Sequence, residues 1–304
     1  MSKRSAFFIG IIFLFSACHL QGVKSEKDKT DSLATQGKTY EELKGVKDSV
    51  YRNPDLLAKK APKTSTDYPN GIKIKWFKHG NGVALQDGHV YMIDYEVLLT
   101  DGTVIDGSKL INRKWVHFLL GYQMEMKGWD FALEHMKIGD FCEVFIPSNL
   151  ARGKVGIPGL VPPDADNILK IKILGEIPPT RTVDGTQIWV LAEAKKFKDS
   201  VADANSEIAF NYVVGTPSNP RFVNSRYKNS PYIYKSSDRG IVKGLKKALI
   251  GVKKNDRLWI IVPPDQAYGK KGMLNEVKPN EPVFYDLTIL QVKNPHVLRE
   301  VTKK

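Results

Sequence analysis

From residue 71 onward the chain is built of short runs in which hydrophobic and polar positions largely alternate. The runs IKIKWF, VYMIDYEVLL, FCEVFIP and ILKIKIL begin at residues 72, 90, 141 and 168. A period of two is typical of strands that bury one face of a sheet. Residues 19–70 are polar and charged, with little apolar periodicity. The pattern therefore predicts a sheet that starts near residue 71.

One stretch departs from this alternation. Trp129, Leu133 and Met136 recur at helical spacing between Gly128 and Gly139, which predicts one short helix. A sheet wrapped on a single helix is an α+β domain. The same order returns later in the chain, with strands expected over residues 208–214, 258–262 and 283–292 and a helix over residues 243–249.

The chain also repeats itself at an offset of 116 residues. The repeated pairs are Gly128 and Gly244, Ala151 and Ala267, Gly153 and Gly269, and Pro163 and Pro279. A period near 116 matches the size of an independent domain and is too long for a solenoid repeat. We expect two copies of one α+β domain, over residues 71–176 and 186–293, joined by a turn-rich linker over residues 177–185.

The N-terminus resembles a secretory leader. Lys3 and Arg4 precede an apolar run over residues 6–15, which is shorter than the roughly 20 residues of a membrane span. The sequence LFSAC that ends at Cys18 resembles the lipobox of bacterial lipoproteins, although Phe15 stands where leucine is usual. We expect a signal peptide over residues 1–17, lipidation of Cys18, a polar tether over residues 18–70 and a basic tail over residues 294–304. The alternative is an ordinary cleaved signal with an incidental cysteine.

These features predict an exported protein that a lipid anchors in the cell envelope. His19 lacks the aspartate that is associated with inner-membrane retention in some bacteria, which favours the outer membrane. The one other cysteine, Cys142, lies in an apolar run, so we expect a small buried hydrophobe.

The net charge of +13 is unevenly distributed. Residues 186–304 contain 21 Lys and Arg against 11 Asp and Glu, whereas residues 70–185 contain 13 against 14. The basic second copy either keeps the protein soluble or attracts an anionic partner, such as a lipid surface or an acidic envelope protein. Nucleic acid is not expected, because basic and aromatic residues are not interleaved.

The chain contains no nucleophile motif, phosphate-binding loop or cysteine pair with metal-ligand spacing. Neither a metal nor a cofactor is therefore expected. Any activity would have to proceed without a nucleophile.

Several motifs of the first copy resemble those of the FKBP-type peptidyl-prolyl cis-trans isomerases. They are DYEVLLTDGTVIDGS at 94–108, HFLLG at 117–121, GWDFALEHMKIGD at 128–140, FIPSNLARG at 145–153 and IPGLVPPDADNILKIKIL at 157–174. The second copy resembles the family more weakly, through AFNYVV at 209–214, PYIYKSSDRGIVKGLKKAL at 231–249, PPDQAYG at 263–269 and VKPNEPVFYDLTIL at 277–290.

The resemblance implies two FKBP-like domains, each an antiparallel sheet wrapped on one short helix. It also implies rotation about the bonds that precede proline in polypeptide clients, an exchange that takes tens to hundreds of seconds without catalysis. An apolar aromatic pocket favours the twisted amide, because the amide loses conjugation as it twists and water is stripped from it.

Carried over residue by residue, the resemblance implies a catalytic pocket in the first copy, with Trp129 as its floor and Tyr95 and Asp106 as its polar wall. The positions that it implies for substrate binding are Ile105, Val116, Met126, Arg152, Val161 and Leu169 in the first copy, and Tyr212, Phe222, Tyr232, Val242, Tyr268 and Tyr285 in the second. The alternative for each aromatic residue is a place in the core of a small sheet domain.

The first copy departs from the family at two of these places and at one neighbouring position, Glu125. Arg152 replaces the tyrosine whose hydroxyl bonds the substrate carbonyl, Glu125 stands where an aliphatic residue is usual, and Val116 where an aromatic is usual. Arg152 can still donate hydrogen bonds, so binding is expected to survive while catalysis weakens.

The second copy departs at the floor and the acid. Leu245 replaces the tryptophan, and Val223 or Asn224 replaces the aspartate, depending on a one-residue alignment choice. We therefore expect an isomerase and folding helper whose first domain is active and whose second domain mainly binds. The alternative function is a non-catalytic adaptor in an envelope complex.

Overall fold

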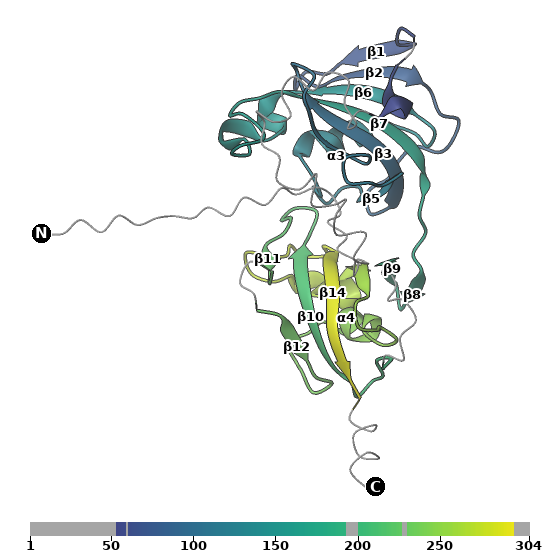
Figure 1. Cartoon of the computed structure of the whole chain (residues 1–304). Helices are drawn as coiled ribbons and strands as arrows, with labels where there is room; N and C mark the ends of the chain where they lie inside the picture. The colour runs from purple at the N-terminus through teal and green to yellow at the C-terminus, as the bar shows by residue number, and fades with distance from the viewer. Residues whose placement is uncertain (1–52, 59, 193–199, 227–229, 295–304) are drawn as a thin grey trace, which may run out of the picture.

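The computed structural model describes residues 53–58, 60–192, 200–226 and 230–294, which form the two domains of Figure 1. Each domain is an antiparallel sheet with one short α-helix, so the predicted α+β class is confirmed. No helix within these ranges has the length and apolar character needed to cross a membrane. The predicted leader, Cys18, most of the tether and nearly all of the basic tail lie outside the described residues.

The first sheet has seven strands in the order β1-β2-β6-β7-β3-β4, and β5 pairs with β3 beside β4. The strands are β1 (Thr64–Asp67), β2 (Lys73–Lys78), β3 (Val90–Leu99), β4 (Val104–Gly107), β5 (Val116–Leu119), β6 (Phe141–Ile146) and β7 (Asn167–Glu176). The α-helix of this domain is α3 (Lys127–Leu133), and short 3₁₀ helices cover Pro54–Leu56, Ser148–Leu150 and Gly153–Val155.

The second sheet repeats this order as β8 to β14. Its path is β11-β10-β14-β13-β9-β8, and β12 pairs with β10 as β5 does with β3. The elements are β8 (Arg181–Val183), β9 (Thr186–Ala192), β10 (Glu207–Gly215), β11 (Val223–Asn224), β12 (Tyr232–Tyr234), α4 (Lys243–Ala248), β13 (Arg257–Val262) and β14 (Val283–Lys293), with 3₁₀ helices at Pro264–Gln266 and Gly269–Lys271.

Burial follows the alternation of the sequence along the outer strands. In β2 the side chains of Ile74 and Trp76 are buried while the intervening lysines are exposed, and β7 alternates in the same way. Strand β3 is buried along almost its whole length, because both faces are covered. Cys142 is free and buried in β6, as predicted.

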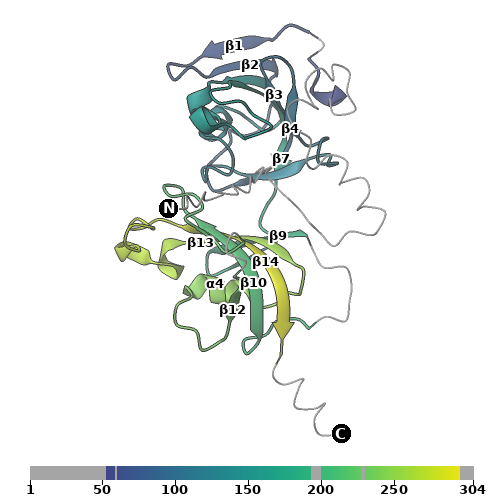
Figure 2. The same ribbon diagram turned by 60° about the vertical axis from the view of Figure 1, so that its left-hand side comes forward.

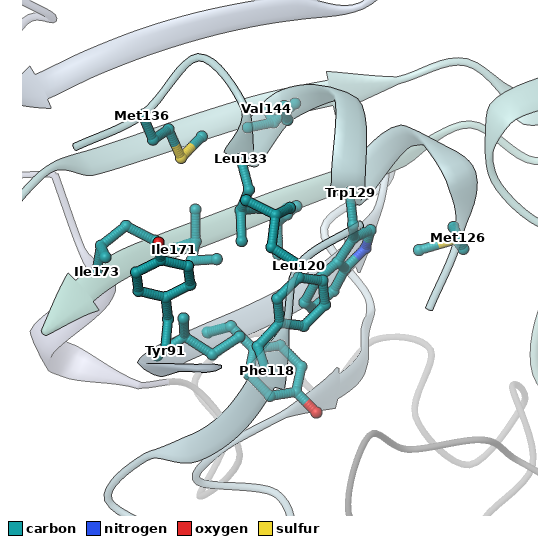
Figure 3. Packing of buried hydrophobic residues seen from close by; sticks show 14 of the residues in the cluster. Tyr91, Phe118, Leu120, Met126, Trp129, Leu133, Met136, Val144, Ile171 and Ile173 are labelled. Carbon is teal, nitrogen blue, oxygen red and sulfur yellow. The ribbon is translucent and has the colours of Figure 1, made fainter. Parts of the chain in front are cut away.

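The helix α3 is shorter than the spacing of Trp129, Leu133 and Met136 suggested. It ends at Leu133, and the next residues form tight turns in which Met136 donates its backbone N–H to the Leu133 carbonyl over 2.9 Å. Met136 therefore lies beyond the helix but remains in the core with the other two residues (Figure 3).

The repeated glycine at each helix start reflects close packing of the helix on the sheet. A Cβ atom on Gly128 would clash with Ile146 of β6, and one on Gly244 would clash with Thr186 and Val262. The recurrence of glycine at an offset of 116 residues thus has a steric cause in both domains.

Part of the segment predicted as a tether belongs to the first domain. Strand β1 pairs with β2, and Leu56 is fully buried against the domain. Asn53 donates its backbone N–H to the Glu96 carboxylate and its side-chain amide to Asp94, each over 2.9 Å. The folded first domain therefore extends upstream of residue 71, and its contacts with β3 cover the outer face of that strand.

The two domains share apolar packing that the sequence did not reveal. Trp189, Trp259, Ile261 and Phe284 of the second sheet are buried in the same cluster as the core of the first domain. The Trp259 ring lies 6.0 Å from the His117 ring of β5. Strand β8, within the predicted linker 177–185, pairs with β9, so the second sheet begins there.

Candidate functional site

The residues predicted for the first pocket converge from four strands, one helix and two connecting segments, β5–α3 and β6–β7. Seven of them are buried in one contiguous apolar cluster, namely Tyr95, Ile105, Val116, Met126, Trp129, Val161 and Leu169. Asp106 on β4 and Arg152 between the two 3₁₀ helices of the first domain are partly exposed and border this cluster. The fold thus brings every predicted residue of this pocket together.

Trp129 lies at the first turn of α3 with only 1% of its surface exposed. The Tyr95 ring meets it edge-on at 5.2 Å between centroids, and the Phe118 ring stacks on it at 5.7 Å. Figure 3 shows the indole between Phe118 and Met126. Within the described part of the chain the indole N–H has no hydrogen-bond partner. Trp129 therefore offers a flat, apolar surface held by other rings.

Asp106 supplies a carboxylate next to this surface. Burial raises its pKa to about 6, while hydrogen bonds from the Gly107 backbone and the Tyr95 side chain, and the charge of Arg152, act in the opposite direction. The Gly107 N–H donates to Oδ1 over 2.7 Å. The Ser108 hydroxyl oxygen accepts the Tyr95 N–H over 3.0 Å and fixes β4 against β3. The carboxylate and phenol are thus held in one wall.

A pair of charged side chains borders the same pocket. Arg152 donates from Nη2 to Oε2 of Glu125 over 3.1 Å, and the Glu125 side chain is only 3% exposed. Burial raises the pKa of Glu125 to about 8; the Arg152 charge opposes this rise and the Asp106 charge adds to it. Arg152 and Glu125, the two departures from the family pattern, therefore bond each other.

The second pocket is assembled in the same way around another cluster. Tyr285 is buried in it, and Tyr212, Phe222, Tyr232, Val242 and Tyr268 are partly buried and pack against it. The Tyr232 ring stacks on Phe210 at 5.6 Å, and burial raises the pKa of Tyr268. Leu245 is buried where the first domain has Trp129.

Strand register settles which residue replaces the acid. Val97 pairs with Asp106 in the first sheet, and Val214 pairs with Val223 in the second. The Ser225 hydroxyl accepts the Tyr212 N–H over 2.8 Å, as Ser108 does for Tyr95. Val223 therefore stands at the position of Asp106, so this wall of the second pocket is apolar.

A carboxylate reaches the second pocket from another direction. The Tyr232 hydroxyl donates to Oδ2 of Asp238 over 3.2 Å, and the Lys235 N–H donates to the same oxygen. Asp238 lies on the loop before α4, which places it outside the strand wall. No feature of the sequence marked Asp238 as a pocket residue.

The sequence also left Glu125 and Phe118 out of the candidate site. The sequence did contain a signal for the Glu125–Arg152 pair, because an acidic residue stands at a usually aliphatic position and an arginine stands in place of a tyrosine. Phe118 could have been found from its own place in a family motif, but its contact with Trp129 depends on the pairing of β5 with β3.

An antiparallel sheet wrapped on one short helix occurs twice here, and in the first copy an aromatic side chain, Trp129, lies at the helix start. The family model of the FKBP-type peptidyl-prolyl cis-trans isomerase matches residues 82–174 and 198–290. These matches cover more than half of the chain, so the chain belongs to this family. The predicted fold and family are both confirmed.

Curated relatives match parts of the chain. The peptidyl-prolyl cis-trans isomerase FKBP10 of Homo sapiens is 26% identical over 210 residues, which cover 68% of this chain and 35% of that protein. FK506-binding protein 4 of Rhizopus delemar is 37% identical over 109 residues, 36% of this chain and 28% of its own length. The matched part thus spans about a third of these relatives.

A solved structure of the three FKBP domains of wheat FKBP73 is 20% identical, with a TM-score of 0.37, and covers 74% of this chain and 96% of that one. The structure of AtFKBP13 is 24% identical, with a TM-score of 0.36, over 38% of this chain and 99% of that one.

Proposed function

We propose that this protein is a peptidyl-prolyl cis-trans isomerase whose first domain carries the activity. The arrangement that supports this most directly is Trp129, held by Tyr95 and Phe118 beside the Asp106 carboxylate, in a member of the isomerase family. A proline ring would lie on the indole, and the buried surroundings would exclude water from the amide that twists.

In this proposal Asp106 and Tyr95 form the polar wall, and Arg152 replaces a hydroxyl donor with a guanidinium. The bond from Nη2 to Glu125 restrains the guanidinium, so its remaining N–H groups are less able than a free hydroxyl to align with a substrate carbonyl. We therefore expect lower activity than in a pocket with a free hydroxyl donor.

The second domain is proposed to bind polypeptides with little catalysis. Its wall carries Val223 and its floor carries Leu245, so both the carboxylate and the indole of the first pocket are replaced by aliphatic groups. Tyr212, Tyr232 and Tyr268 remain partly exposed and offer an apolar, hydrogen-bonding surface. A non-catalytic adaptor, the alternative function, would bind its partner through both degenerate pockets and the basic second domain.

The test is acceleration of a proline-limited refolding reaction by the full chain. Trp129→Leu, which gives the first pocket the floor of the second, is expected to reduce the acceleration at least tenfold. Trp115→Leu is the matched control, because that side chain is 37% exposed. Wild-type protein that gives no acceleration at high concentration would support the adaptor instead.

We further propose that the protein is exported and lipid-anchored in the cell envelope, through Cys18. The basic start, the apolar run and the small residues before this cysteine support the proposal. Fractionation of cells that express Cys18→Ser tests it, because the variant is expected to leave the membrane fraction.

An anionic partner for the second domain is also proposed. Lys253, Lys254, Lys270 and Lys271 are exposed, whereas Lys246 and Lys247 are bonded within the domain to Asp238 and Asp184. Replacement of these four exposed lysines with serine tests the proposal, and reduced sedimentation with anionic vesicles would support a lipid surface as the partner.

A further inference from the structure

The predicted lining residues of the first pocket are more deeply buried than their equivalents in the second. Tyr95 and Met126 are buried, while their counterparts Tyr212 and Val242 are only partly buried. The two domains have the same topology, so their folds do not account for this difference. Its cause must lie in the side chains at the pocket border or in what covers them.

The loop before α3 differs most clearly between the domains. In the first domain residues 121–126 are buried or partly buried, whereas Ser237, Arg239 and Gly240 in the equivalent loop of the second domain are exposed. Glu125, which bonds Arg152, belongs to the covered loop. The covered loop and the charged pair therefore form one unit at the border of the first pocket.

What covers this loop is the second domain. The Tyr122 ring lies 5.7 Å from the Phe284 ring of β14, and the Gln123 side-chain amide donates to the Pro217 carbonyl over 3.4 Å. The Arg221 charge acts on Glu125 and favours its ionised form. Pro217 and Arg221 lie on the turn between β10 and β11, on the side of the second domain that faces the first (Figures 1 and 2).

That turn is fixed to its own domain. Glu281 accepts the Ser218 N–H over 2.7 Å and its hydroxyl over 3.0 Å, and Asn219 donates from Nδ2 to Glu276 over 2.9 Å. A turn held in this way moves with the second domain as a rigid body. Any change in how the domains pack would therefore be transmitted to residues 121–126.

We propose that the second domain regulates the first pocket by holding residues 121–126 where Glu125 bonds Arg152 and the pocket is closed. This inference rests on the proposed isomerase function. Loss of the contact releases the loop, frees Arg152 and admits a proline-containing chain. The second domain is thus an autoinhibitory element within the same chain, besides any binding role of its own.

The test uses the full chain with Arg221→Gly. Arg221 has a φ of 59°, so glycine suits its backbone, and the substitution removes the charge that acts on Glu125. We expect amide hydrogen exchange in residues 120–127, which lie in the other domain, to become several times faster. Loss of this charge interaction is expected to raise kcat/KM for a proline tetrapeptide roughly fivefold.

Two further variants complete the experiment. Gln123→Gly, at a φ of 47°, removes the bond to Pro217 and is expected to act in the same direction. Asn255→Gly, at a φ of 70° and exposed, is the matched control and should change neither readout. Unchanged exchange in Arg221→Gly, or a fall in kcat/KM with folding intact, would overturn the inference. Absence of isomerase activity in every variant would refute the proposed function alone, because exchange still reports the contact.

Discussion

Replacement of Glu125 by glutamine should stabilise the protein at neutral pH and leave its stability unchanged at pH 4. The folded state raises the pKa of this carboxyl from 4.5 to about 8, chiefly through burial. The folded state then binds the proton more tightly than the unfolded state does. The contribution of this protonated carboxyl to the stability of the folded state is complete below pH 4.5 and is lost as the pH rises towards 8.

The size of the effect follows from the same shift. Each pH unit between 4.5 and 8 is expected to lower the stability of the wild type, relative to Glu125→Gln, by about 1.4 kcal/mol. At pH 7 the difference amounts to about 3 kcal/mol. Glutamine is neutral at every pH and keeps a carbonyl that can accept from Arg152, so it removes the ionisation without opening a cavity.

Urea denaturation followed by tryptophan fluorescence at pH 5, 6, 7 and 8 measures this difference. Glu143→Gln is the control, because that carboxylate pairs with Lys75 on the surface over 3.1 Å, and its loss should change stability by less than about 1 kcal/mol. A Glu125→Gln advantage that does not vary with pH would refute the reasoning. A variant less stable than wild type at pH 8 would show that the pair with Arg152 outweighs the burial.

Three further predictions concern packing, two of them between the domains and one within the first domain. Burial lowers the pKa of His117 to about 4, so protonation of this side chain should destabilise the folded state as the pH falls below 6.5. The wild type should therefore lose about 2 kcal/mol of folding stability between pH 7 and 5 that His117→Phe keeps, as measured by denaturation at each pH. Trp259→Ala should cost about 3–5 kcal/mol and separate the unfolding of the domains into two calorimetric transitions; a single transition at the wild-type temperature would contradict the shared core. Gly128→Ala should lower the melting temperature, because its methyl group meets Ile146. Gly175→Ala, also in the first domain, is the control, because its methyl group would only reach ordinary contact with Met92 at 3.8 Å.

Much of the fold could be read from local pattern. A period of two identified the strands, because the side chains of a half-buried strand are alternately buried and exposed. The offset of 116 residues identified two copies, because each helix packs so closely on its sheet that only glycine fits at its start. The residues of both pockets followed from family motifs, and the fold brings them together. The end of α3 was placed too late, since Met136 is buried after a turn that mimics helical spacing.

The extent of the first domain was less visible. Strand β1 reads TSTD and is exposed throughout, so no alternation marks it, and its pairing with β2 alone defines it. Leu56 is a single apolar residue in a polar segment, whose burial depends on the outer face of β3. Isolated residues of this kind carry no periodic signal.

The sequence by itself determined the duplicated α+β domain and its family, and it predicted the residues of the two pockets, since each of these depends on local spacing or on a motif. Only the tertiary structure decided that Val223 replaces Asp106, because strand register fixes that choice. Only the tertiary structure shows that Arg152 bonds Glu125, and that Phe284 and Pro217 contact the loop that carries Glu125. These contacts link residues far apart in the chain, and packing between two surfaces leaves no periodic trace in either.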